Sequence, residues 1–188
     1  MKIHEKIEKG LSLVVACFRS LGYITAKWDI EETDEIPTMG VTYRKLLYNP
    51  SYVEKLEQPY VSAVLLHEVV HCLLLHPSEI TKEQAKGKDH SRWVVALEVV
   101  TNAVVKEFSR QYEKVFVLPG KAYSPISRCY VADGRTNNAE GIYFYDFLGS
   151  EKTAPEIYKM IPDDLDTRMV DFFSDILPAD VNADQQDA

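Results

Sequence analysis

The segment His67-Glu68-Val69-Val70-His71 contains two histidines four residues apart, with a glutamate directly after the first. On an α-helix, residues at this spacing project from the same face one turn apart, which lets two imidazoles share one zinc ion. Glu68 is offset from His67 by about 100° of helical rotation, so it can reach a metal-bound water rather than the metal. The pattern predicts an HExxH site with His67 and His71 as zinc ligands and Glu68 as the general base.

The residues around this motif are apolar on every face of the expected helix, which must therefore be largely buried. The alternative is that the three polar residues are incidental on a core helix. Each buried polar group left unsatisfied would cost about 1–3 kcal/mol, and a metal ion with a bound water would remove that cost for all three. A metal site is therefore the favoured interpretation. The apolar neighbours are Val64, Leu65, Leu66, Val69, Val70, Leu73, Leu74 and Leu75.

A catalytic zinc usually has three protein ligands and one position for water, so a third ligand is needed. His76 is one candidate, but nine residues after His67 it would point about 180° away on an unbroken helix. Pro77 disfavours helical geometry at His76, yet no glycine lies between His71 and His76 to reverse the chain. His76 could equally be a helix-end histidine that interacts with the last carbonyl groups.

Glu98 is the rival candidate because it lies in a wholly apolar stretch, Trp93 to Val100, where a buried carboxylate needs a cation. A core lysine or arginine could be that cation, although Arg92 and Lys106 are more than a turn away. Asn102 follows Glu98 by one turn on the same face and could hydrogen-bond a ligating histidine from behind. We favour Glu98 over His76 as the third ligand, with Asn102 as the supporting residue.

With these residues the chain resembles the bacterial family of "putative metallopeptidase" domains, a zincin-like HExxH family often found N-terminal to a von Willebrand factor A-like domain. The resemblance covers about residues 36 to 148. It rests on Ile36–Val41, Leu47–Pro50, the motif with His76, then Trp93, Ala96 and Asn102, and finally Ala139–Tyr143 with Leu148.

The family pattern has an aspartate at the position of Glu98, so this chain keeps an acid with one more methylene. The resemblance therefore implies a ligand role for Glu98. It also implies a gluzincin-type arrangement, in which a carboxylate on a later helix completes the site. A von Willebrand-type domain is not present in these 188 residues, so functions that depend on it are not implied.

Apolar periodicity predicts the elements that position the site. We expect a first helix from Ile3 to near Gly22, a small antiparallel sheet over residues 22 to 48, and a short helix from Ser51 through Leu56. The metal helix should run from about Tyr60 toward Leu75, followed by a polar loop at Thr81–Asp89 and a second long helix from Ser91 to Ser109. The predicted strands are Tyr23–Trp28, Thr38–Tyr43 and Leu46–Tyr48, and further helices are predicted at Ala139–Leu148, Pro155–Ile161 and Thr167–Leu177.

Together these elements predict an α+β, zincin-like (gluzincin-type) domain in which the small sheet packs on the HExxH helix and a second long helix. The length of 188 residues suits one domain, which we place at residues 1–178. Residues 179–188 are expected to be an acidic, disordered tail, because the acids are concentrated near the C-terminal end of the chain.

Composition argues against several classes of partner. The net charge is −8 and there is no Lys/Arg-rich run, so we expect no nucleic acid partner. The longest apolar stretch is shorter than the roughly 20 residues that span a bilayer, so we expect no membrane span. Three widely spaced cysteines without a CxxC pair indicate neither a disulfide framework nor a zinc finger, and favour a cytoplasmic location.

The predicted function is zinc-dependent hydrolysis of peptide bonds by a zinc-bound water with Glu68 as general base. The substrate would be a polypeptide, bound by strand addition to the edge near Thr38–Tyr43. The alternative is a non-catalytic zinc-containing interaction module, whose closed site would use His67, His71, His76 and Glu98 together. A regulatory protease of toxin or phage type, with one dedicated target, is a third possibility, and the sequence determines neither the substrate nor the oligomeric state.

Overall fold

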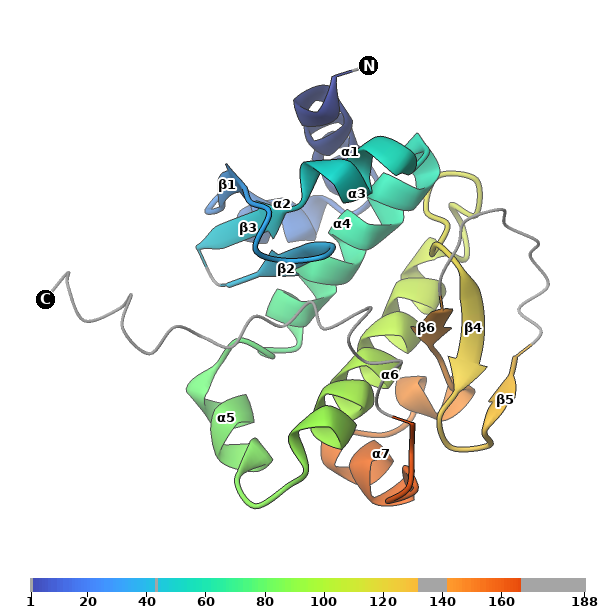
Figure 1. The fold of residues 1–188 in the computed structure, drawn as a ribbon. Coiled ribbons are helices and arrows are strands. Elements are labelled where there is room, and N and C mark those ends of the chain that lie inside the picture. Colours follow the sequence, from blue (N-terminus) through green and yellow to red (C-terminus); the bar gives the residue numbers. More distant parts are fainter. Residues whose placement is uncertain (1, 43, 132–141, 167–188) are drawn as a thin grey trace, which may run out of the picture.

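The computed structural model describes residues 2–42, 44–131 and 142–166 and shows a mixed α+β structure with two small sheets (Figure 1). The helices are α1 (Ile3–Cys17), α2 (Gly22–Thr25), α3 (Pro50–Lys55), α4 (Gln58–Leu73), α5 (Glu79–Ala85), α6 (His90–Ser109) and α7 (Ala154–Met160), with 3-10 segments η1 (Arg19–Leu21) and η2 (Phe147–Ser150). The strands are β1 (Asp29–Glu32), β2 (Met39–Val41), β3 (Lys45–Tyr48), β4 (Lys121–Ser124), β5 (Cys129–Tyr130) and β6 (Ile142–Phe144).

Helix α4 carries the HExxH motif and is buried along its length from Val61 to Cys72. Pro59 lies in its first turn, where a backbone N–H has no partner within the helix, so the N–H that proline lacks costs no helical hydrogen bond. Side chains that are apolar on every face leave no outer face for water, so this helix is enclosed by the rest of the molecule. The prediction of a buried motif helix is confirmed, although the helix begins at Gln58 and ends at Leu73.

Helix α6 is the second long helix, and Asp89 caps its N-terminus by accepting a hydrogen bond from the Arg92 backbone N–H at 2.9 Å. It begins one residue before the predicted start and ends at Ser109, as predicted. α6 packs beside α4 between the two small sheets, as Figure 1 shows. The face of α6 that contains Glu98 and Asn102 is buried. The two helices that carry the candidate residues are therefore neighbours.

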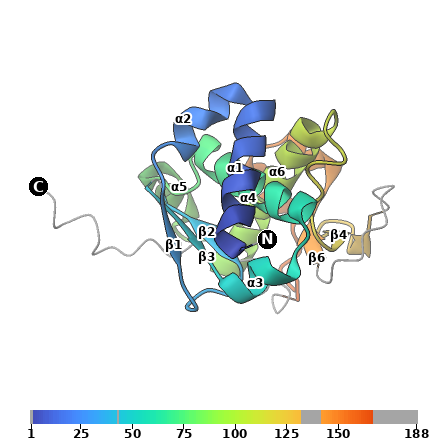
Figure 2. The ribbon, with the colours of Figure 1, turned by 90° about the horizontal axis from the view of Figure 1, so that it is seen from above.

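Helix α1 packs across α4, which Figure 2 shows from above. Gly10 allows this close approach, because a Cβ there would lie 2.5 Å from Cδ1 of Leu65 on α4. The prediction that the first helix runs to Gly22 is wrong: α1 ends at Cys17, and the chain continues through η1 and α2. The short helix predicted from Ser51 exists as α3, with Asn49 as its cap.

The first sheet has the order β1-β3-β2 and is mixed, because β1 pairs with β3 in parallel and β2 pairs with β3 antiparallel. The prediction of a purely antiparallel sheet is therefore wrong. So is the strand at Tyr23–Trp28, where residues 22–25 are helical and the strand begins at Asp29. The other two predicted strands are present as β2 and β3. β2 is an edge strand and packs against α4.

The second sheet, with the order β5-β4-β6, was not predicted. The helix predicted at Ala139–Leu148 is wrong where it is described, because residues 142–144 form β6 and η2 follows. The loop predicted at Thr81–Asp89 contains most of α5, whereas the helix predicted at Pro155–Ile161 is confirmed as α7. The predicted helix at Thr167–Leu177 and the tail at 179–188 lie outside the described residues.

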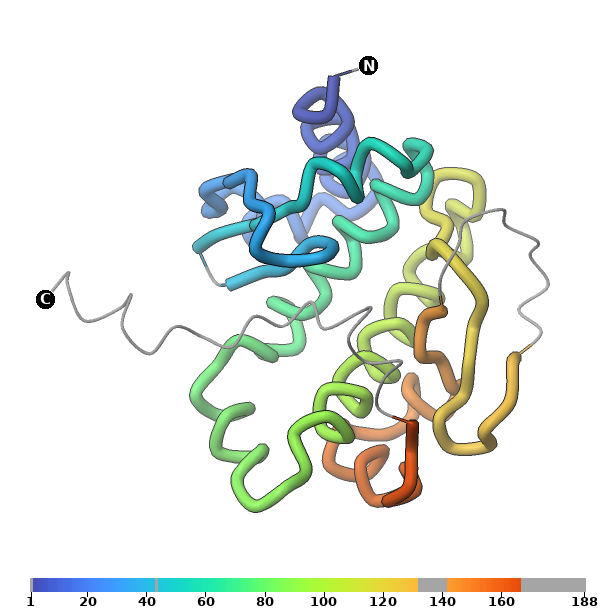
Figure 3. The backbone as a smooth tube through the Cα atoms, in the orientation of Figure 1, coloured from blue at the N-terminus to red at the C-terminus, as the bar shows by residue number. Residues whose placement is uncertain are grey.

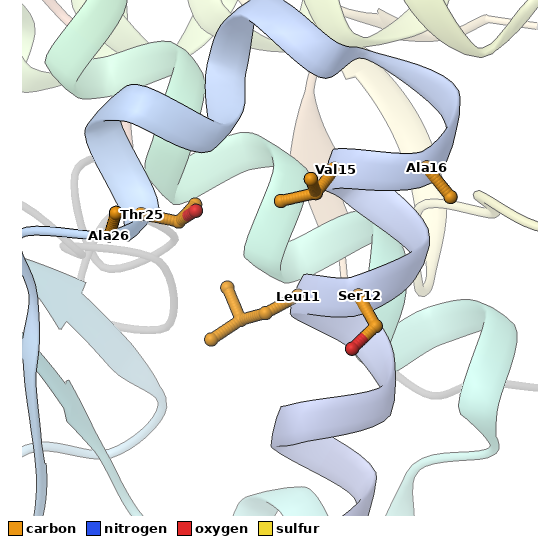
Figure 4. Close-up of a pocket in the computed structure, with 6 residues that line it drawn as sticks. All are labelled: Leu11, Ser12, Val15, Ala16, Thr25 and Ala26. Atoms are coloured by element: carbon orange, nitrogen blue, oxygen red, sulfur yellow. The ribbon is translucent and has the colours of Figure 1, made fainter.

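The buried apolar side chains form two clusters. The first joins α1, the first sheet, α4 and the C-terminal part of α6, and the second joins residues 93–100 of α6 with β6 and α7. A surface hollow of about 490 Å³ lies between α1 and α2 (Figure 4), and none of the predicted site residues lines it. Among the described residues, no helix combines the length and apolar character required to cross a bilayer.

Candidate metal centre

The side chains of His67, His71 and Glu98 converge between α4 and α6, each offering one ligand atom within 4.8 Å of the others. Nε2 of His67 and Nε2 of His71 lie 3.2 Å from the two carboxylate oxygens of Glu98, and 2.7 Å from each other. All three side chains are buried. Two sequence segments about 30 residues apart thus supply one donor cluster.

Asn102, one turn after Glu98 on α6, faces the opposite nitrogen of His67. Its Oδ1 lies 2.9 Å from Nδ1 of His67, while its Nδ2 donates to the backbone carbonyl of Phe144 on β6 at 2.9 Å. Because the amide nitrogen is committed to that carbonyl, Oδ1 must accept, and Nδ1 of His67 must carry the proton. In the neutral ring, Nε2 of His67 then presents its lone pair toward Glu98.

His76 lies behind His71, on the side of the ring opposite to Glu98. The two Nδ1 atoms are 2.8 Å apart, so one of them donates and the other accepts. His76 comes to lie against His71 because the chain reverses at Leu75, whose φ is +60°. The expectation that a glycine is needed for this reversal is wrong, since a leucine adopts the left-handed conformation here.

Electrostatics at the site reflect deep burial. Burial lowers the pKa of His71, with the charge of Glu98 acting in the opposite direction. Burial, helped by His71, lowers the pKa of His76 to about 2, so His76 is neutral and can accept a hydrogen bond. Burial alone would raise the pKa of Glu98, but its attraction to His67 and His71 outweighs burial and lowers that pKa. Glu98 is therefore a carboxylate.

Glu68 is fully buried on α4 and is not a member of the His67, His71 and Glu98 group found among the described residues. Glu68 lies one turn before Cys72 and affects the pKa of the Cys72 thiol. Burial, and next the charge of Glu68, raise that pKa to about 12. Cys72 is therefore a protonated, buried thiol at neutral pH, with its Sγ 3.7 Å from the Thr42 carbonyl oxygen.

The donor set suits a cation. If the outer nitrogens of His67 and His71 carry the protons, both inner nitrogens present lone pairs beside the Glu98 carboxylate. Three electron-rich groups at such distances repel one another unless a cation lies among them. Two imidazole nitrogens and one carboxylate oxygen are ligands that zinc accepts in proteins. The residues present therefore fit a metal ion.

Sequence reasoning did not identify two contacts that support these rings. Thr101, buried on α6, places its Oγ1 3.4 Å from Nδ1 of His76. The carbonyl of Phe144 orients Asn102 from a strand that the sequence did not predict. Neither had a signal in the sequence, because a threonine in an apolar helix and a backbone carbonyl are unremarkable until the helix and the strand are placed beside each other.

Comparison with known proteins gives one family. The model of a family described as "Putative metallopeptidase domain" matches residues 9–137, which is well over half of the chain and includes every predicted site residue. No curated protein and no solved structure gives a significant match. The family resemblance inferred from the motif and its flanking segments is confirmed.

Proposed function

This chain belongs to that family of metallopeptidase domains, and from this premise we propose that it is a zinc-dependent peptidase of the zincin type. The observation that carries the proposal is the buried convergence of His67, His71 and Glu98 from two neighbouring helices. In this proposal the three residues are the zinc ligands, and Glu98, on the later helix, gives the site its gluzincin-like character.

The position of His76 supports three protein ligands rather than four. Its Nδ1 faces the Nδ1 of His71, on the far side of that ring from Glu98. A site with three protein ligands keeps one position for water or substrate, as catalytic zinc sites do, whereas structural sites are closed by four. The arrangement therefore favours a peptidase over an interaction module with a structural metal.

A bound zinc ion would supply a Lewis acid that lowers the pKa of a water molecule to about 7. Glu68 would take the proton from that water during attack on the scissile carbonyl carbon and return it to the leaving amine. The helical offset of Glu68 from the two histidines suits this role, because its carboxylate projects from a neighbouring face of α4. His67, His71 and Glu98 would hold the reacting groups in place without exchanging protons.

A polypeptide substrate is the proposal that the first sheet supports. β2 is the edge strand in the order β1-β3-β2 and packs against the helix that carries the motif. An extended peptide could add to such an edge through main-chain hydrogen bonds, which would bring its carbonyl groups close to α4. The strand predicted near Thr38–Tyr43 is the one that occupies this edge.

The test combines metal analysis with the Glu68→Gln variant. We expect purified wild type to bind one equivalent of zinc and to cleave members of a diverse peptide library, read by mass spectrometry. Glu68→Gln should retain zinc and lose cleavage by 10²-fold or more, since general bases typically contribute that much. Glu57→Gln, an exposed substitution at the start of the same helix, is the matched control and should cleave normally.

Three results would contradict the proposal. Wild type that binds no zinc would reject the metal site. Zinc-loaded wild type that cleaves nothing would favour a non-catalytic module. Zinc lost from His76→Ala but kept by Glu98→Ala would show that His76, and not Glu98, is the third ligand. Glu107→Gln, an exposed change on α6, is the control and should leave zinc content unchanged.

A further inference from the structure

The turn after α4 has the hydrogen bonds of a Schellman motif. The backbone N–H of His76 donates to the carbonyl of His71 at 2.9 Å, and that of Leu75 donates to the carbonyl of Cys72 at 3.1 Å. This motif places one residue in the left-handed region, usually glycine, and here that residue is Leu75 with φ of +60°. The turn folds the chain back over the last turn of the motif helix.

The reversal delivers the side chain of His76 to the back of His71. His76 is 6% exposed, although it lies next to Leu75, which is 49% exposed. Its Nδ1 lies 2.8 Å from Nδ1 of His71 and 3.4 Å from Oγ1 of Thr101 on α6. Thr81 on α5 contributes to the same turn, because its Oγ1 donates to the carbonyl of Leu75 at 2.9 Å. Three helices thus hold one imidazole in place.

We propose that His76 is a positioning residue, which accepts a hydrogen bond from Nδ1–H of His71 and thereby keeps the Nε2 lone pair of His71 directed at the metal site. The proposal deepens the proposed function and rests on it for the identity of the metal. His76 would then do for His71 what Asn102 does for His67, so each motif histidine has its outer nitrogen occupied by a different acceptor.

The direction of this hydrogen bond follows from the two rings. His71 can use Nε2 as a metal ligand only if that nitrogen has a free lone pair, which puts its proton on Nδ1. Nδ1 of His76 must then be the acceptor, and in the neutral ring the proton of His76 is on Nε2. Metal-ligating histidines commonly donate their second nitrogen in this way, and loss of such a partner costs about 10–100-fold in metal affinity.

A matched pair of variants separates hydrogen bonding from packing. In His76→Asn the amide oxygen can occupy the place of Nδ1 and accept the same hydrogen bond, whereas His76→Leu has a similar size and no acceptor. We expect the zinc dissociation constant, measured by competition with a chromophoric chelator, to rise about 10–100-fold in His76→Leu. In His76→Asn it should stay much closer to the wild-type value. Circular dichroism would confirm that both variants fold.

A second measurement does not depend on activity. In the zinc-bound protein, ¹⁵N-edited NMR of the histidine rings should show a slowly exchanging proton on Nδ1 of His71 in wild type and in His76→Asn. Absence of that proton in wild type would overturn the proposal, even if neither variant folds.

The outcomes distinguish this inference from the proposed function. Wild type without zinc affinity would reject the proposed function, whereas a zinc-binding wild type that lacks the Nδ1 proton of His71 would reject this inference alone. Equal zinc affinity in wild type and His76→Leu would reject the inference alone, as would equally weak binding by the asparagine and leucine variants. Loss of zinc as complete as that in His71→Ala would make His76 a ligand, which also overturns it.

Discussion

At the scale of single residues, Asn102 illustrates how one side chain can set the protonation of another. Its amide nitrogen is used by the carbonyl of Phe144, which leaves only its oxygen for Nδ1 of His67. A carboxylate could also accept from His67, but it could not donate to Phe144 and would add a buried negative charge beside Glu98. An amide is therefore the side chain that satisfies both neighbours.

We predict that Asn102→Leu weakens zinc binding by about 10–100-fold, because Nδ1–H of His67 and the carbonyl of Phe144 each lose their partner. Titration with a competing chelator measures this directly. Asn102→Asp should lie between the leucine variant and wild type, since it restores an acceptor for His67 but not a donor for Phe144. Wild-type affinity in Asn102→Leu would show that the hydrogen bond to His67 has no effect on metal binding.

The candidate site was predictable from the sequence to different extents at different residues. The pairing of His67 with His71 is local, since four residues along a helix fix the geometry, and burial of Glu98 followed from its apolar neighbours. The orientation of His76 was not predictable, because it depends on the backbone handedness of Leu75, a residue that rarely adopts positive φ. Thr101 and Phe144 act only through contacts between elements distant in sequence.

At the scale of elements, the end of α4 carries a conformational cost. A non-glycine residue in the left-handed helical region is strained by about 1–2 kcal/mol. Leu75 has this conformation, and its side chain is half exposed. Figure 3 shows the backbone turning here from α4 toward α5. The Schellman hydrogen bonds, with the buried contacts of His76, offset the cost.

We predict that Leu75→Gly raises the free energy of unfolding by about 0.5–1 kcal/mol, because relief of the strain exceeds the extra entropy of the unfolded chain. Leu73→Gly is the matched control: Leu73 is similarly exposed, at 42%, but lies within α4. It should lower the free energy of unfolding by about 1 kcal/mol. Urea denaturation of both variants gives the comparison, and destabilisation by both would contradict strain at Leu75.

The helices α3, α4, α6 and α7 and the strands β2 and β3 were predictable from the sequence, whereas α5 and β6 were not, for a physical reason. α4 and α6 have many apolar residues at helical spacing, so their burial determines their conformation. α5 is a short polar helix whose N-cap, Ser78, accepts a hydrogen bond from the Thr81 N–H. Its sequence has no apolar stripe that would predict a helix. β6 is only three residues long, and its conformation depends on pairing with β4.

Gly149 in η2 allows a close approach to the helix that carries Glu98. A Cβ at this position would lie 2.5 Å from the backbone carbonyl oxygen of Val99. We predict that Gly149→Ala lowers the free energy of unfolding by about 1–3 kcal/mol and weakens zinc binding, because α6 must move. Denaturation and chelator competition would measure the two effects.

Gly10→Ala is the comparison, since its new Cβ would meet Cδ1 of the flexible Leu65 side chain and the alanine favours the helix. It should cost less than Gly149→Ala. An equal or greater cost at Gly10 would show that backbone contact at Gly149 is not the limiting feature.

At the scale of the whole molecule, the candidate metal centre lies where the two apolar clusters meet. His67 and His71 belong to α4, which packs in the first cluster, and Glu98 belongs to the part of α6 that packs in the second. A cation bound by all three would link the clusters directly. Without a cation, the contacts of Glu98 with Nε2 of the two histidines remain, but no ion coordinates the three side chains at once.

Zinc removal should therefore lower the stability of the entire chain and not only its activity. A ligand that binds only the folded state stabilises it by about 4 kcal/mol at 1,000 times its dissociation constant. For a domain of this size that corresponds to a rise in Tm on the order of 10 °C. Thermal unfolding with excess zinc and after treatment with a chelator would measure the difference. Glu98→Gln should unfold at nearly the same temperature in both conditions, because it lacks the carboxylate through which α6 would hold the metal. A wild type that binds zinc yet shows no rise in Tm would mean that the ion does not bind the folded state preferentially, and the link between the two clusters would then have to come from apolar packing alone.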